Sequence, residues 1–161
     1  MNPFPPFPPR PRRAGFTLVE IMIVVTIIGL LAALAIPAIS RVQRVAQNNR
    51  VANDFRVFAQ AFEVYATQNA TWPTNAGAGV VPAGLSGADF KVSVWQAPTT
   101  IGGKWNWDRN ISGFSAGISI SSFTCSDAQL QEIDAKIDDG DLTTGNFQKV
   151  QANRVMLILE Q

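Results

Sequence analysis

A single acidic residue, Glu20, stands near the start of an apolar run from Phe16 to Ile39. As a helix rising 1.5 Å per residue, this run spans about 36 Å, enough to cross a hydrocarbon core of about 30 Å. A carboxylate in such a segment is costly unless a cation pairs with it, and it therefore indicates a functional site. The chemistry it predicts is ion pairing, which neither a plain anchor nor a secretion signal requires.

The residues before the run form a basic leader, Met1–Gly15, with six prolines and with Arg10, Arg12 and Arg13. Proline at this density is incompatible with a helix or a strand interior, so we expect an extended, accessible leader. A secretory signal is cut after its apolar region, where this chain has no clear cleavage site. Arginines flank the run on both sides, so the positive-inside rule leaves its orientation open.

The sequence Gly15-Phe16-Thr17-Leu18-Val19-Glu20 resembles the cleavage and methylation motif of type IV prepilins and type II secretion pseudopilins. The resemblance covers residues 12–40 closely and extends more loosely to about residue 69. It implies that prepilin peptidase cleaves between Gly15 and Phe16 on the cytoplasmic side, and that the new Phe16 amine is methylated. It also implies that the leader is cytoplasmic and the head periplasmic. The chain would remain in the bacterial inner membrane until it enters a periplasmic or extracellular filament.

The same resemblance assigns roles to three residues inside the run. Glu20 is implied to pair with the N-terminal amine of a neighbouring subunit during filament assembly. Gly29 and Pro37 interrupt the run, and the proline removes one helical hydrogen bond, which predicts a mild kink. The resemblance implies that the stretch between these two residues supplies helix flexibility when subunits pack.

A second helical pattern continues beyond Ile39 without a break. Apolar residues recur at steps of three and four in an apolar stripe made of Val51, Phe55, Phe58, Phe62 and Tyr65. This spacing is typical of a helix that buries one face, so the stripe predicts a sheet packed against it. The helix should end near residues 68–69, because Trp72-Pro73 follows.

The remaining residues predict a small antiparallel sheet with one short helix. Trp105 and Trp107 should share a buried sheet face, and a turn is expected over residues 108–110. Ser126 is a good N-cap for the short helix. The expected strands are Phe90–Gln96, Lys104–Asp108, Phe114–Ser121 and a central Val155–Leu159, and the expected helix is Asp127–Lys136.

The predicted fold class is α+β and pilin-like, with a long N-terminal helix packed on a small antiparallel sheet. Four segments are expected. They are a cleaved leader at 1–15, the transmembrane half of the helix at 16–39, its amphipathic stem at 40–70, and a globular head at 71–161.

Composition argues against an enzyme. The chain has no histidine and one cysteine, Cys125, so it lacks the commonest general base and cannot form an intrachain disulfide. Its net charge of +1 predicts no nucleic-acid surface. No cofactor is expected. The weaker alternative is a calcium ion held by oxygens of Asp138, Asp139 and Asp141 together with Asn146.

The sequence therefore predicts a structural subunit, a pseudopilin or minor pilin, of a type II secretion filament. Its expected partners are prepilin peptidase, other copies and related subunits, the inner-membrane assembly platform and membrane lipid. Trp72-Pro73-Thr74 resembles the residues that follow the stem in secretion pseudopilins, and the single Cys125 excludes the C-terminal disulfide of many type IV pilins. A type IV pilus subunit and a membrane-anchored periplasmic binding module are the alternatives.

Overall fold

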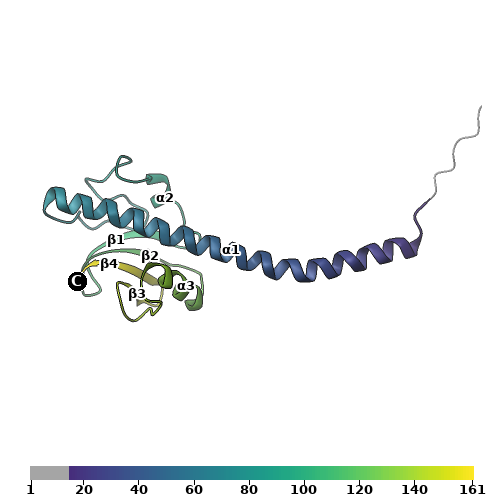
Figure 1. Cartoon of the computed structure of the whole chain (residues 1–161). Helices are drawn as coiled ribbons and strands as arrows, with labels where there is room; N and C mark the ends of the chain where they lie inside the picture. Colours follow the sequence, from purple (N-terminus) through teal and green to yellow (C-terminus); the bar gives the residue numbers. More distant parts are fainter. Residues whose placement is uncertain (1–14) are drawn as a thin grey trace, which may run out of the picture. The chain divides into compact units, whose positions relative to one another are not determined.

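A computed structural model describes residues 15–161, which fall into two compact units that meet between Arg41 and Val42. The leader before Gly15, with its arginines, lies outside the described residues. Figure 1 labels seven elements: α1 (Leu18–Asn69), α2 (Val92–Gln96), β1 (Lys104–Ile111), β2 (Phe114–Ser121), α3 (Asp127–Ile137), β3 (Phe147–Gln151) and β4 (Arg154–Glu160). The helix α1 ends where Trp72-Pro73 predicted that it would end.

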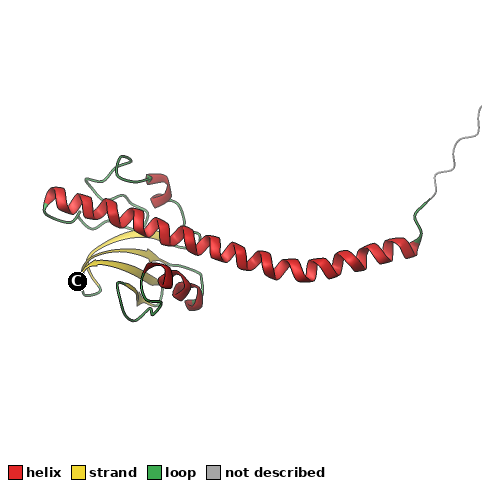
Figure 2. Cartoon of the chain, in the orientation of Figure 1, coloured by secondary structure: helices red, strands yellow, loops and turns green. Residues whose placement is uncertain are grey.

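The four strands form one antiparallel sheet in the order β1-β2-β4-β3, drawn in yellow in Figure 2. The register of the β1–β2 pair sets Trp105 opposite Ile120 and Trp107 opposite Ile118. The apolar strand β4 lies between β2 and β3, as its continuous run of apolar residues predicted. The predicted α+β class, with a long helix on a small antiparallel sheet, is confirmed.

The apolar stripe of α1 forms the core of the second unit together with the sheet. Phe55, Phe58 and Phe62 are fully buried. The Phe55 ring meets the Trp105 ring edge-on with centroids 4.7 Å apart, and the Phe62 ring stacks on Trp107 at 4.2 Å. Aromatic pairs at these distances each add about 0.5–1.5 kcal/mol beyond the area they bury. Trp105 and Trp107 are therefore packing residues, as their sheet-face pattern predicted.

The prediction of a strand over residues 90–96 is wrong. Residues Val92–Gln96 form α2, a single short turn of helix. Its Trp95 is fully buried, packs on Phe58 with ring centroids 4.9 Å apart, and donates its indole N–H to the carbonyl of Val80 at 2.9 Å. The alternating valines indicated a strand, but insertion of this one large side chain into the core determines the local backbone.

The predicted turn over residues 108–110 is also wrong, because β1 continues to Ile111 and the turn follows at Ser112-Gly113, both with positive φ. Asp108 is buried within the sheet, where Arg154 of β4 donates to it at 2.9 Å. This ion pair across non-neighbouring strands cannot be read from local turn chemistry. The strand β3 was not predicted, because its sequence Phe-Gln-Lys-Val-Gln carries few apolar residues.

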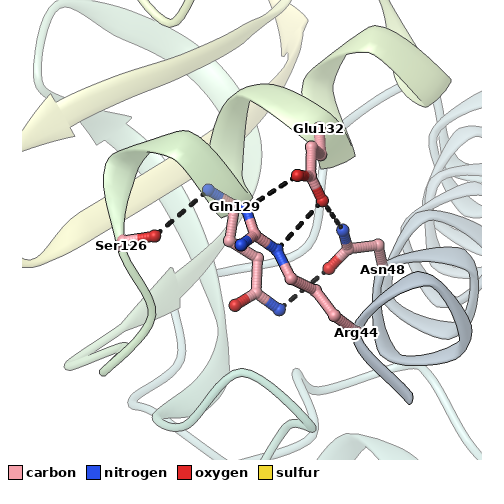
Figure 3. Close-up of polar contacts among 5 residues, drawn as sticks. All are labelled: Arg44, Asn48, Ser126, Gln129 and Glu132. Atoms are coloured by element: carbon pink, nitrogen blue, oxygen red, sulfur yellow. Dashed lines mark hydrogen bonds and ion pairs between the residues drawn. The ribbon is translucent and has the colours of Figure 1, made fainter. Parts of the chain in front are cut away.

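Polar contacts fasten α3 to the stem part of α1 (Figure 3). Asn48 is fully buried, and its side-chain amide donates to Glu132 at 2.7 Å while its carbonyl accepts from Gln129 at 2.9 Å. Arg44 adds two hydrogen bonds to the same Glu132 carboxylate, at 2.7 and 3.1 Å. Ser126 caps α3 as predicted, accepting from the Gln129 backbone N–H. The buried amide and the exposed arginine thus hold the same helix.

We expect Asn48→Ala to lower the free energy of unfolding of the second unit by about 1–3 kcal/mol, because it removes the two hydrogen bonds that this buried amide makes with α3 and leaves the space of its side chain empty. Arg44→Ala is the matched control. It removes a salt bridge whose side chains are 40% and 48% exposed, so it should cost only about 0–1 kcal/mol. Denaturant unfolding of the full chain in detergent, followed by tryptophan fluorescence, measures both. Equal losses in the two variants would contradict this ranking.

Candidate processing and assembly segment

The peptide bond between Gly15 and Phe16 lies just before the first helical residue, Leu18. Phe16 is 83% exposed, and a Cβ added at Gly15 would meet no atom within 4 Å in the described chain. A helical backbone would withhold its amides and carbonyls from a peptidase, whereas residues 15–17 lie outside the helix. The structure thus leaves the predicted cleavage point accessible.

Glu20 takes part in a reciprocal cap at the start of α1. Its backbone N–H donates to Thr17 Oγ1 at 3.2 Å, and its Oε2 accepts from the Thr17 backbone N–H and from Thr17 Oγ1, each at 3.3 Å. This is the capping box of a Thr-x-x-Glu sequence, in which two helix-terminal donors are satisfied reciprocally. Sequence reasoning missed Thr17, although its spacing from Glu20 was a sufficient signal.

The cap fixes where the carboxylate lies. It holds the Glu20 carboxylate on Thr17, the residue next to the Phe16 amine that cleavage would create. An anionic group is also favoured there by the positive end of the helix dipole. The arrangement can therefore present one carboxylate, already oriented, to a cation at the start of the helix.

The first part of α1 presents apolar side chains on all sides. Its best window has a mean hydropathy of 2.7 and no buried residues, so by length and composition it is a candidate to cross a membrane. Large side chains such as Ile27, Leu30 and Leu34 are all more than half exposed. Lipid or neighbouring apolar chains are the surroundings that such a surface requires. An N-terminal apolar helix of this kind fits a membrane-anchored chain.

Gly29 and Pro37 both lie inside the continuous helix α1. A Cβ at Gly29 would meet nothing within 4 Å in the described chain, so the packing around this position does not require a glycine. Pro37 supplies no N–H to the turn before it, and the Ser40 hydroxyl donates back to the Ile36 carbonyl at 3.0 Å. The missing N–H of Pro37 and the hydrogen bond from Ser40 both weaken the helical hydrogen bonding at this point. The role of Gly29 and Pro37 in helix flexibility stays a prediction.

Among the acidic residues of the predicted calcium site, Asp138 and Asp139 lie close together. Asp141 accepts from the hydroxyl of Thr143 at 2.7 Å and from its backbone N–H at 3.0 Å. Those hydrogen bonds with Thr143 lower the pKa of Asp141. Asn146 approaches through its backbone N–H, which donates to Asp138.

A third carboxylate, Asp134, joins Asp138 and Asp139, and sequence reasoning missed it. Burial, followed by the charge of Asp139, raises the pKa of Asp134 to about 6. Its spacing of four residues from Asp138 at the end of a helix was the available signal. Cys125 is half-buried against the core, and burial raises the pKa of its thiol.

Comparison with known proteins supports the N-terminal motif. The family described as the prokaryotic N-terminal methylation motif matches residues 10–36, which confirms the resemblance drawn from Gly15, Phe16 and Glu20. No curated protein matches the chain. Among solved structures, the major type IV pilin PilA1 from Clostridium difficile is similar over 73% of this chain and 97% of that chain. Its sequence identity is 17% and its TM-score 0.47. The chain thus combines a prepilin-type N-terminal motif with a long helix and a helix-on-sheet head.

The capping box makes a prediction for the two residues that form it. Thr17→Ala should destabilise the first turn of α1 by about 1 kcal/mol, whereas Glu20→Gln should preserve the cap because glutamine fills the same position of the box. Amide hydrogen exchange of Leu18–Ile21, measured by NMR on the full chain in detergent micelles, reports both effects. We expect roughly fivefold faster exchange in Thr17→Ala only.

The matched control is Thr26→Ala, because the Thr26 hydroxyl donates to the Met22 carbonyl inside the helix at 2.8 Å and caps nothing. That variant should leave exchange at Leu18–Ile21 unchanged. Equal loss of protection in Thr17→Ala and Glu20→Gln would show that the glutamate charge, and not the box, holds the helix start.

Proposed function

We propose that this chain is a structural subunit, a pseudopilin or minor pilin, of a helical filament assembled at the bacterial inner membrane, and that it is not an enzyme. The observation that carries the proposal is the methylation motif at residues 10–36 joined to an apolar helix whose side chains have no partners among the described residues. Such a surface is stable in lipid and stays stable when neighbouring copies replace the lipid.

The processing step follows from the accessible peptide bond. Prepilin peptidase cleaves between Gly15 and Phe16 with the leader in the cytoplasm, and the Phe16 amine is then methylated. The apolar part of α1 remains as the membrane anchor, with the head in the periplasm. The assembly platform and related subunits are the partners that this sequence of events requires.

Glu20 provides the assembly contact. A carboxylate and an amine are both costly at membrane depth, and pairing them between subunits neutralises both. The cap on Thr17 holds the carboxylate at the start of the helix, so little side-chain entropy is lost when the amine of a neighbouring copy approaches. The pair would also set the axial position of each new subunit.

Within this class we favour a type II secretion filament over a type IV pilus. Two features support that choice: the Trp72-Pro73-Thr74 sequence after the stem, and the single cysteine, which rules out a disulfide closing the head. In the head, Trp72 packs beside Trp107 with ring centroids 5.5 Å apart, and Trp107 donates to the Pro73 carbonyl at 3.1 Å. These residues thus hold the connection that leaves the end of α1.

Processing is tested by the intact mass of the chain from membranes that contain or lack prepilin peptidase. We expect the wild type to lose Met1–Gly15 and gain one methyl group only when the peptidase is present. Gly15→Ala should remain uncut, because a side chain there blocks close approach of the backbone to the peptidase. Gly29→Ala, the same change within the apolar run, should be processed normally. An unprocessed wild type would favour a membrane-anchored binding module instead.

Assembly is tested with Glu20→Gln in the processed chain. We expect normal membrane insertion and cleavage but at least a tenfold loss of subunits in sheared filaments, since removing one member of a desolvated ion pair typically costs 2 kcal/mol or more. Thr17→Ala keeps the charge while removing the cap, and should assemble far better than Glu20→Gln. Equal assembly of Glu20→Gln and wild type would overturn the ion-pair role.

A further inference from the structure

One flank of the head carries a pocket beside two cations that have no acidic partner. The pocket has a volume of about 270 Å³ and lies between the stem part of α1 and the segment that runs from α2 to the start of β1. Its lining includes the buried Val51 and Trp105 and the exposed Arg50 and Lys91. Neither cation makes an ion pair within residues 15–161. We call this the basic pocket.

The basic pocket has an excess of positive charge. Asp54 is the one acidic residue among those that line it. Burial raises the pKa of Asp54, and the charge of Arg50 opposes that shift. Two cations against one carboxylate, beside apolar surface, favour an occupant that brings negative charge.

The opposite charge gathers in the acidic loop, residues 138–141. Asp138, Asp139 and Asp141 are all exposed, and their charges add to burial in raising the pKa of Asp134. Asp134 is itself buried, and its side-chain oxygens have no hydrogen-bond partner in the described part of the chain. Like charges held this close repel one another, so the approach of cations from outside the chain is favourable here.

The carboxylates of the acidic loop are already oriented. Asp139 accepts from the Thr144 hydroxyl at 2.8 Å and from the Asp141 backbone N–H at 2.9 Å. Asp141 accepts from the Thr143 hydroxyl at 2.7 Å. Because these bonds already restrict the two side chains, little conformational entropy is lost when they bind a partner.

The two charged surfaces lie on different flanks of the head. The sheet order β1-β2-β4-β3 makes β1 and β3 its two edges. The basic pocket includes Trp105 of β1, whereas the acidic loop leads into β3 at Phe147. Figure 1 shows α2 and α3 on opposite sides of α1. The surfaces therefore meet between copies of the chain and not within one copy.

We propose that the acidic loop of one copy binds in the basic pocket of the next, with Asp139 and Asp141 pairing with Lys91 and Arg50. The proposal rests on the filament subunit role proposed above, and it adds a contact between heads to the contact at Glu20. Each copy offers one pocket and one loop, so the interface joins two different surfaces. An interface of that kind repeats from copy to copy and can build an open helical filament.

Charge exchange tests this contact. Lys91→Glu and Asp139→Lys should each lower the amount of subunit in sheared filaments about tenfold, because each brings like charges together. The double variant places opposite charges there again and should recover most of the filaments. Asp127→Lys, the same reversal at an exposed position of α3 outside the acidic loop, should not rescue Lys91→Glu. A double variant no better than Lys91→Glu alone overturns the proposal.

Cross-linking tests the contact without requiring filaments. The full chain in membranes carries Cys125→Ala, so that only introduced thiols react with a short bifunctional thiol reagent. Lys91→Cys combined with Asp139→Cys should give a ladder of dimers, trimers and larger products, and either change alone should give none. Ala152→Cys combined with Lys91→Cys is the matched control, because Ala152 is exposed at the other end of β3 from the acidic loop.

The outcomes separate this proposal from the proposed function. Dimers from either single variant would indicate a twofold contact, and cross-links only to a different subunit would indicate another partner; each result overturns the proposal, as does the absence of a ladder. If the wild type forms no filaments, the filament role fails, and a ladder in membranes still supports the contact between copies.

Discussion

Removal of apolar surface from water along α1 is the constraint on which the rest of the structure depends. In the stem part the requirement is met within the chain, since Phe55, Phe58 and Phe62 pack into the tryptophans of β1 and of α2. In the first part the side chains from Phe16 to Ile39 remain almost entirely exposed. The stem part of α1 therefore organises the folded head by burying one face, whereas the first part needs lipid or other subunits around it.

Polar groups that enter apolar surroundings need partners, and this chain provides them by different means. Glu20 is satisfied locally, by a residue three positions earlier. Asn48 and Asp108 are satisfied by residues distant in sequence, on α3 and on β4. The buried side-chain oxygens of Asp134, by contrast, have no hydrogen-bond partner in the described chain.

The capping box gives Glu20 a structural role within the single chain. The ion pair that we propose between Glu20 and the amine of another subunit would act at the same end of the helix as this cap. The two roles depend on different properties: the cap needs a hydrogen-bond acceptor, and the ion pair needs a charge. A substitution that removes the charge of Glu20 but keeps a hydrogen-bond acceptor therefore distinguishes the two roles.

Local pattern determined much about this protein. The apolar run, the stripe on the stem, the Ser126 cap and the apolar strand β4 were all readable, because each rests on periodicity or on contacts within a few residues. The match at residues 10–36 confirms the motif around Gly15 and Glu20. Only the tertiary structure decided that residues 92–96 are helical, that β1 continues through Asp108, and that Asp134 joins the loop acids. In each case a contact with a distant segment outweighed the local preference: the core around Trp95, the arginine of β4, and the folded loop at Gly145.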